Sequence, residues 1–315
     1  MTDTAVTGRF FRYPKRLARH SALRNWLEYA AALSVVGSLR VAPRPAAERL
    51  ARLYTRLLDV ALPRLRRVAM RNLALAMPEK TAAEHRAITA GVFDSIARLL
   101  VAVSKFPGIR RENLSRWVRS EGLEHVEAAR RAGRGVLFAT AHLGNWELSA
   151  FAHALLAEPI HVVVRPLDNP LIDRLIQRRR TLSGNRVIEK RDFARAILKA
   201  LEANQAVGIL IDQNANPDQG VFVDFFGVPA CAGMGFAKIA ARSGAAVIPG
   251  FALWSKEEKR YVLRFYPPVE MGGSPEEDTR RMQRQLEAVI REHPDQWLWI
   301  HRRWKTRPPG EPPLY

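Results

Sequence analysis

A histidine and a glutamate stand five residues apart in the stretch AHLGNWE at 141–147. On a regular helix this offset turns two side chains about 140° apart, so they could not touch there. They can meet if His142 precedes the helix and Gly144 makes the turn. A histidine whose second ring nitrogen bonds a carboxylate can serve as a general base. We therefore predict that His142 is a base whose tautomer Glu147 fixes; a buried histidine bonded by its own helix start is the alternative.

The usual partners of such a histidine are missing from the sequence. It contains no GxSxG nucleophile motif and no HExxH zinc motif, and the single cysteine, Cys231, lies far from His142. An external hydroxyl activated by His142 is then the simplest nucleophile, and acyl transfer from a thioester suits this chemistry best. Because a thioester is already activated, we expect neither a cofactor nor a metal.

The elements around this stretch alternate between strands and helices. Strands are predicted at 135–141, 161–166, 186–189, 206–212, 245–254 and 261–269, and helices at 147–157, 170–182, 192–203, 233–243 and 276–293. This alternation predicts an α/β fold with a mixed, mostly parallel sheet flanked by helices. His142 directly follows one predicted strand and Asp212 is the last residue of another, and sites in such folds gather at the carboxyl ends of strands.

The segment before the α/β part reads as helical throughout. Residues 44–131 carry a helical period, and Thr81 with Glu84 forms a capping box at the start of one helix. We expect a basic, apolar membrane-attachment segment at 1–43, a helical layer at 44–131, an α/β domain at 132–305 and an irregular tail at 306–315.

The composition indicates an acidic partner. The 315 residues include 50 Lys and Arg against 31 Asp and Glu, a formal net charge of +19. Nucleic acid, an anionic membrane, an acidic carrier protein or a phosphorylated substrate would fit, although the excess can also be only a solubilising surface. No nucleic-acid motif is present, so a nucleic-acid partner is not expected.

The amino-terminal segment combines positive charge with an apolar run. The run WLEYAAALSVVGSL at 26–39 is shorter than the roughly 20 residues that a spanning helix needs. It can lie in a membrane interface or be a buried core helix. The basic residues of this segment are Arg9, Arg12, Lys15, Arg16, Arg19 and Arg24.

Several ordered blocks resemble one family from end to end. HLGNWE at 142–147 resembles the HxxxxD/E block of glycerolipid acyltransferases, and its surroundings resemble the bacterial lipid A biosynthesis acyltransferases, the lauroyl and myristoyl transferases. The other matching blocks are RNLALAMPEKTAAEHRAI, VVVRPLDNPLIDRLIQRRR, GILIDQNANPDQGVFVDFFGVPA and PDQWLWIHRRWKTRP. The resemblance implies a glycerol-3-phosphate-acyltransferase-like layered fold with an amino-terminal helical layer.

The resemblance also implies roles for single residues. His142 is the catalytic base and Glu147 its partner, while Arg165 corresponds to an arginine that binds acceptor phosphate. Asp212 corresponds to an aspartate near the active site, although a pair with an arginine would explain it equally well. Backbone N–H groups at Gly144 and Asn145 could hold the thioester oxyanion.

The arginines 178–180 and His301 each allow two interpretations. The arginines 178–180 can be a solvated helix face or a dock for an acidic carrier protein. His301, between aromatic and basic residues, is expected to be structural or to contact the acceptor rather than to be catalytic.

The predicted activity combines the base at His142 with the resemblance, which implies the acyl carrier protein donor and the lipid A acceptor. The chain is expected to move a fatty acyl chain from an acyl carrier protein thioester to a hydroxyl of a lipid A precursor or similar phosphorylated glycolipid. It would work at the cytoplasmic face of the inner membrane, attached peripherally or by one amino-terminal anchor. Acyl-CoA-dependent transfer to another membrane lipid, such as a phosphatidylinositol mannoside, and non-catalytic binding of anionic lipid are the alternatives.

Overall fold

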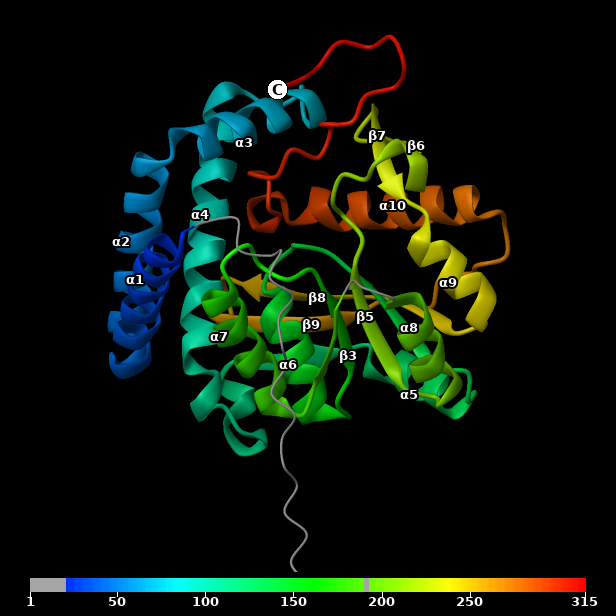
Figure 1. Ribbon diagram of the computed structural model, residues 1–315, viewed down its shortest axis with the longest axis horizontal. Coiled ribbons are helices and arrows are strands. Elements are labelled where there is room, and N and C mark those ends of the chain that lie inside the picture. The colour runs from blue at the N-terminus through cyan, green and yellow to red at the C-terminus, as the bar shows by residue number, and fades with distance from the viewer. Residues whose placement is uncertain (1–20, 190–192) are drawn as a thin grey trace, which may run out of the picture.

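The computed structural model describes residues 21–189 and 193–315 (Figure 1). The basic residues Arg9, Arg12, Lys15, Arg16 and Arg19 lie outside the described residues. The helices are α1 (Ala22–Val41), α2 (Arg44–Ala61), α3 (Pro63–Ala76), α4 (Ala82–Lys105), α5 (Leu123–Arg131), α6 (Trp146–Leu156), α7 (Pro170–Arg180), α8 (Phe193–Glu202), α9 (Gly235–Ser243) and α10 (Pro275–Glu292).

The strands form a large sheet and a separate hairpin. They are β1 (Val118–Glu121), β2 (Val136–Thr140), β3 (His161–Val164), β4 (Arg186–Glu189), β5 (Ala206–Leu210), β6 (Gly220–Phe225), β7 (Val228–Gly233), β8 (Ala246–Ser255) and β9 (Arg260–Phe265). The seven-stranded sheet has the order β1-β9-β8-β2-β5-β3-β4, and β6 pairs with β7. Within the large sheet only the β8–β9 pair is antiparallel. The predicted α/β fold with a mixed, mostly parallel sheet is confirmed.

Three strands escaped prediction. β1 lies in the segment expected to be helical, so that expectation was wrong there; its four residues alternate too little to be recognised, and its partner is β9, far along the chain. β6 and β7 are joined by a two-residue turn at Phe226 and Gly227, both with positive φ. Such turns usually carry Asn-Gly or Asp-Gly, so the Phe-Gly pair gave no hairpin signal.

The amino-terminal helices form a layer beside the sheet. In Figure 1 helices α1 and α2 lie together at the left edge, and α4 stands between them and the α/β part. The predicted capping box is present at the start of α4, because Thr81 and Glu84 each accept the other's backbone N–H. In the described chain the stretch Ala82–Gly108 is long and apolar enough to cross a bilayer. However, 56% of its apolar 18-residue window is buried inside the protein, as expected of a core helix.

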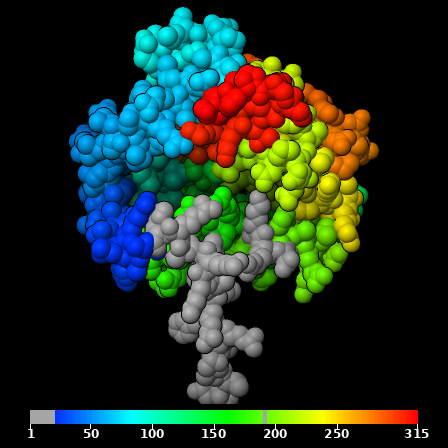
Figure 2. Space-filling view, turned by 45° about the horizontal axis from the view of Figure 1, so that its top comes forward, coloured from blue at the N-terminus to red at the C-terminus, as the bar shows by residue number. Residues whose placement is uncertain are grey.

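The carboxyl-terminal segment packs against the β6–β7 hairpin and lies next to α3. Trp297, Trp299 and Trp304 are fully buried and pack against Phe225 and Phe226 of the hairpin. These tryptophans therefore fill the core rather than facing a membrane. Figure 2 shows the final residues, in red, lying between α3 and the β6–β7 hairpin.

The turn between β2 and α6 depends on a glycine. Gly144 has φ +63°, and a Cβ atom there would lie 2.1 Å from the carbonyl oxygen of Ala252 in β8. The side chain of Asn145 then caps α6 by accepting the N–H of Leu148 at 3.0 Å. Only glycine lets the chain pass this close to β8 and still start the helix.

We therefore expect Gly144→Ala to lower the free energy of unfolding by about 2 kcal/mol or more, because the alanine would combine a left-handed conformation with a steric clash. Urea denaturation measures this change. Gly108→Ala is the matched control, since no atom lies within 4 Å of its Cβ position, and it should change the stability by no more than about 1 kcal/mol. Equal losses in the two variants would contradict the steric argument.

Candidate active site

The register of two parallel strands brings His142 and Asp212 together. β2 pairs with β5 so that Thr140 lies opposite Leu210. Two residues beyond this pair, the chains reach His142 and Asp212 at the same edge of the sheet. Nδ1 of His142 lies 2.9 Å from a carboxylate oxygen of Asp212, and the backbone N–H of His142 donates to the other oxygen at 3.0 Å.

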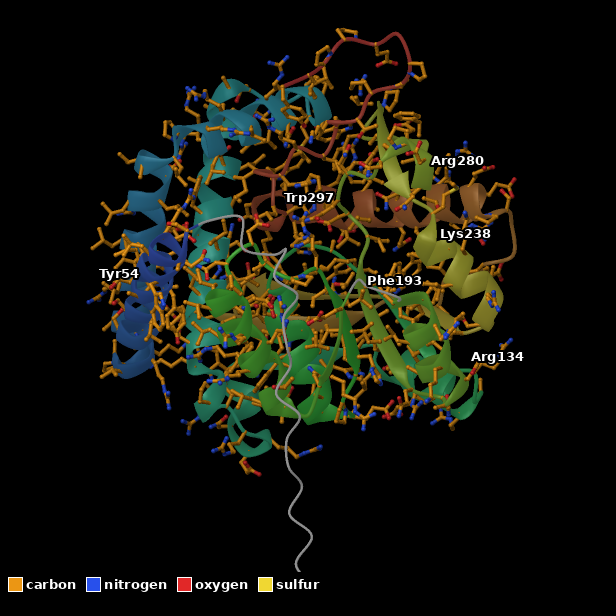
Figure 3. All side chains as sticks on the ribbon, in the orientation of Figure 1. Tyr54, Arg134, Phe193, Lys238, Arg280 and Trp297 are labelled. Atoms are coloured by element: carbon orange, nitrogen blue, oxygen red, sulfur yellow. The ribbon has the colours of Figure 1, made fainter. Side chains whose placement is uncertain are left out.

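Asp212 is a buried anion held by three donors. Its third hydrogen bond comes from Nε1 of Trp297, 2.9 Å from the oxygen that also accepts the backbone N–H. Trp297 lies inside the molecule near the start of the carboxyl-terminal segment (Figure 3). Because a carboxylate accepts but does not donate, Nδ1 of His142 must carry the proton. Nε2 of His142 has no hydrogen-bond partner among the described residues and remains available as a base.

The same contacts tune both groups. Burial would raise the pKa of Asp212, but the positive charge of a protonated His142 and the hydrogen bonds lower it to about 2. Burial would lower the pKa of His142, yet the charge of Asp212, the hydrogen bond to it and the charge of Glu147 together raise it above its ordinary value. The imidazole is therefore a stronger base than an isolated histidine.

The expected hydrogen bond between Glu147 and His142 is not formed. Instead Glu147, in the first turn of α6, makes an ion pair with Arg180 at the end of α7, and Nε of Arg180 lies 2.8 Å from its carboxylate. Both side chains are largely buried, and burial, which lowers the pKa of Arg180, is outweighed by the hydrogen bond and charge of Glu147, so this pKa is raised. Glu147 acts on His142 only through its charge, and the orienting carboxylate is that of Asp212.

The backbone groups expected to bind an oxyanion are already used. The N–H of Gly144 donates to the carbonyl oxygen of Gln296, and the N–H of Asn145 donates to that of Ala252. The Asn145 side chain caps α6 as described. Neither residue has a backbone donor left for a substrate, so that expectation was wrong.

The basic residues expected at the site differ in their surroundings. Arg165 follows β3, the neighbour of β5, at the same edge of the sheet; its side chain is 68% exposed and lies 3.6 Å from Asp168. Of the three arginines 178–180, only Arg178 is exposed. Arg179 donates to the carbonyl oxygens of Val103 and Ser104, and Arg180 pairs with Glu147. A solvated face formed by all three is therefore excluded.

An apolar pocket lies between the sheet and α6. It contains about 710 Å³ not occupied by protein atoms, including the part open to solvent. Trp146, whose ring centroid is 5.0 Å from that of His142, lines one part of it, and Phe138, His153 and Phe265 line another. Trp146 and His153 are seven residues apart on α6, which corresponds to about 10 Å. The pocket thus extends along α6 from Trp146, which contacts His142, toward Phe138 and Phe265 in the core.

The carboxyl-terminal segment contributes residues that the sequence did not assign to the site. Besides Trp297, the backbone N–H of Leu298 donates to the carbonyl oxygen of His142 at 3.0 Å. The N–H of His301 donates to Leu298, and Nε2 of His301 accepts the N–H of Asn214 at 3.2 Å. The run of tryptophans around His301 was visible in the sequence, but nothing local connected it with residue 142.

The raised pKa of His142 can be tested without any substrate. We expect an imidazole pKa above 6.5 in the native protein and below 6.5 in Asp212→Asn, because the substitution removes the negative charge while burial remains. Titration by NMR measures both, with His142→Gln identifying the resonance. Unchanged titration of His142 after the Asp212→Asn substitution would show that the carboxylate does not set this pKa.

Comparison with known proteins identifies the family. Residues 13–306 match the family described as bacterial lipid A biosynthesis acyltransferase. The chain is 31% identical over 257 residues to a lipid A biosynthesis lauroyltransferase of Escherichia coli (strain K12), covering 81% of this chain and 83% of that protein.

Two other proteins of the same organism show similar coverage. A lipid A biosynthesis palmitoleoyltransferase is 31% identical over 270 residues, covering 84% of this chain and 87% of that protein. A lipid A biosynthesis myristoyltransferase is 26% identical over 248 residues, covering 78% and 77%. The match over nearly the whole chain, together with a histidine and carboxylate beside an apolar pocket, shows that the chain belongs to the bacterial lipid A biosynthesis acyltransferases and is an acyltransferase.

Proposed function

We propose that this enzyme transfers a fatty acyl chain from an acyl carrier protein thioester to a hydroxyl of a lipid A precursor, with His142 as the general base. The observation that carries the mechanism is the hydrogen bond between Nδ1 of His142 and Asp212, because it leaves Nε2 as the basic nitrogen. Nε2 takes the proton of the acceptor hydroxyl while its oxygen forms a bond to the thioester carbonyl carbon. The tetrahedral intermediate then breaks its carbon–sulfur bond, and the leaving thiolate takes the proton from the imidazolium.

The other residues have supporting roles in this proposal. Asp212 holds the tautomer and stabilises the imidazolium, and Glu147 with Arg180 forms a buried pair in the wall of the pocket beside Trp146. The apolar pocket receives the acyl chain of the donor. Arg165 is exposed at the same edge and binds a phosphate of the acceptor.

The location of the reaction follows from the substrate. Lipid acceptors reside in membranes, and the charge of +19 favours an anionic surface. We propose that the enzyme works at the cytoplasmic face of the inner membrane, held peripherally or by one amino-terminal anchor.

His142→Ala should reduce the transfer of a radiolabelled acyl chain by roughly 10²- to 10⁴-fold, because the base is lost. His125→Ala, on helix α5, is the control and should retain the wild-type rate. Turnover by His142→Ala close to that of the control would end the mechanistic proposal.

The pH profile gives a second test of the same base. Only the neutral imidazole accepts a proton, so kcat/KM should fall as pH drops below the raised pKa of His142. In Asp212→Asn the acidic limb should move to lower pH and the maximal rate should decline. An acidic limb that stays in place would point to a different ionising group.

Mass spectrometry of lipids tests the acceptor. Cells lacking the gene should accumulate lipid A with one acyl chain fewer, and the purified enzyme should restore that chain from the acyl carrier protein thioester. A change confined to another lipid, or transfer from acyl-CoA alone, would contradict the proposed substrates.

A further inference from the structure

The fully buried residues of helix α2 are small, whereas several of its large apolar side chains are exposed. Ala47, Ala51 and Thr55 are buried and face the protein, whereas Leu57 is 58% and Val60 80% exposed. An amphipathic helix of a water-soluble domain normally has the opposite arrangement, since burying large apolar side chains is what stabilises it. The outward face of α2 therefore suits an apolar environment.

Helix α1, next to it, also exposes large apolar side chains, although Val36 and Leu39 in its last two turns are buried. Leu23, Trp26, Leu27 and Leu33 are exposed along one side, with Trp26 at 59%, while the polar Asn25 is buried. Nδ2 of Asn169 donates to the carbonyl oxygen of Asn25 and to the carboxylate of Glu28.

The two helices form one edge of the molecule. Figures 1 and 3 show them side by side there, with Tyr54 labelled in Figure 3. We define the α1–α2 surface by the exposed large apolar residues of the two helices and of the residue after α2, which are Leu23, Trp26, Leu27, Leu33, Val41, Leu53, Leu57, Leu58, Val60 and Leu62. Apolar patches of this kind are rare on soluble monomers and mark an interaction site.

The charges on these helices show what kind of partner fits. Each of their three acidic residues makes an ion pair with an arginine: Glu28 with Arg24, Glu48 with Arg44, and Asp59 with Arg66. Arg40, Arg49 and Arg56 are exposed and have no ion pair among the described residues. The surface is thus apolar with an excess of positive charge, which complements the acyl chains and the anionic headgroups of a bilayer.

We propose that the α1–α2 surface lies in the headgroup region of an anionic membrane, with its apolar side chains in the acyl layer. Helix α1 is bound to α4 and α7, so it remains part of the protein rather than crossing the bilayer as a separate anchor. This inference rests on the proposed function and identifies the residues that contact the membrane. Both helices contribute to the contact, although the sequence assigned α2 only to the helical layer.

The test uses vesicles with and without phosphatidylglycerol. The triple variant Leu53→Ser, Leu57→Ser, Val60→Ser should bind anionic vesicles at least tenfold more weakly in sedimentation, because these side chains no longer enter the acyl layer. Leu53→Met, Leu57→Met, Val60→Met keeps the apolar surface and should bind normally. Brominated lipid should quench the fluorescence of Trp26, identified by comparison with Trp26→Phe.

The outcomes separate this inference from the proposed function. The serine variant should keep its rate on acceptor dissolved in detergent micelles and lose rate only on acceptor in vesicles; loss of rate in micelles as well would point to the fold or the chemistry. Unchanged vesicle binding, absence of Trp26 quenching, or a stable dimer that the serine substitutions dissociate would overturn the membrane assignment.

A second observation concerns His301 and also rests on the proposed function. The backbone donors expected for the oxyanion are occupied at Gly144 and Asn145. His301 lies beside the dyad, because its Nε2 accepts the N–H of Asn214, two residues after Asp212, at 3.2 Å. Burial lowers the pKa of His301 to about 4. The ring is therefore neutral at working pH. Because Nε2 accepts the N–H of Asn214, the proton resides on Nδ1, and Nδ1 has no partner in the described chain.

We infer that Nδ1–H of His301 donates a hydrogen bond to the oxygen that becomes negative when the hydroxyl attacks the thioester. A neutral imidazole can give this bond without supplying a proton, and its other nitrogen is fixed by the backbone. The segment that carries it is tied to the base, since the N–H of Leu298 donates to His142 and that of His301 donates to Leu298.

Two isosteric variants test the two ring nitrogens separately. His301→Asn keeps an N–H group near the position of Nδ1, whereas His301→Gln keeps an acceptor near Nε2. His301→Ala and His301→Gln should lower kcat by about 10²- to 10³-fold with little change in KM, and His301→Asn should retain most of it. Full activity in His301→Gln, or equal losses in the Asn and Gln variants, would assign His301 a structural role only.

Discussion

The buried carboxylate of Asp212 is the charge on which the site depends. Removing an anion from water is costly unless hydrogen bonds replace the lost solvent. Here three donors do so, from the ring and backbone of His142 and from the indole of Trp297. Two of these bonds come from His142 and fix the position and tautomer of its imidazole. The contacts that stabilise the anion therefore also orient the proposed base.

This arrangement explains why distant segments are packed so tightly around one edge of the sheet. β2 and β5 supply the histidine and the aspartate, and the carboxyl-terminal segment supplies Trp297 and binds the backbone of His142. The aromatic cluster with Phe225 and Phe226 holds that segment in place. The hairpin therefore helps to hold Trp297 against Asp212. Among the described residues it forms no hydrogen bond with His142 or Asp212.

The site and the amino-terminal helices present different kinds of surface. Its polar dyad lies at the strand ends beside a pocket lined mainly by apolar groups, and its amino-terminal helices turn leucines outward. Such a distribution suits the proposed reaction, in which a thioester donor and a membrane lipid acceptor meet at one site. The outward leucines of these helices matter for the same proposal, because they would bring the site to an acceptor in the membrane.

The sequence by itself determined the local features. Periodicity located six of the nine strands in the described chain and most helices, a capping box marked the start of α4, and the sequence around His142 predicted a base at a strand end. What only the tertiary structure decided was which groups meet. Strand order is a non-local property, so periodicity could not reveal that β5 is the neighbour of β2 and that Asp212 rather than Glu147 bonds His142. Likewise Glu147 pairs with Arg180 because α6 and α7 pack together, and the outward leucines of α2 became visible only once α4 was seen to cover its alanines.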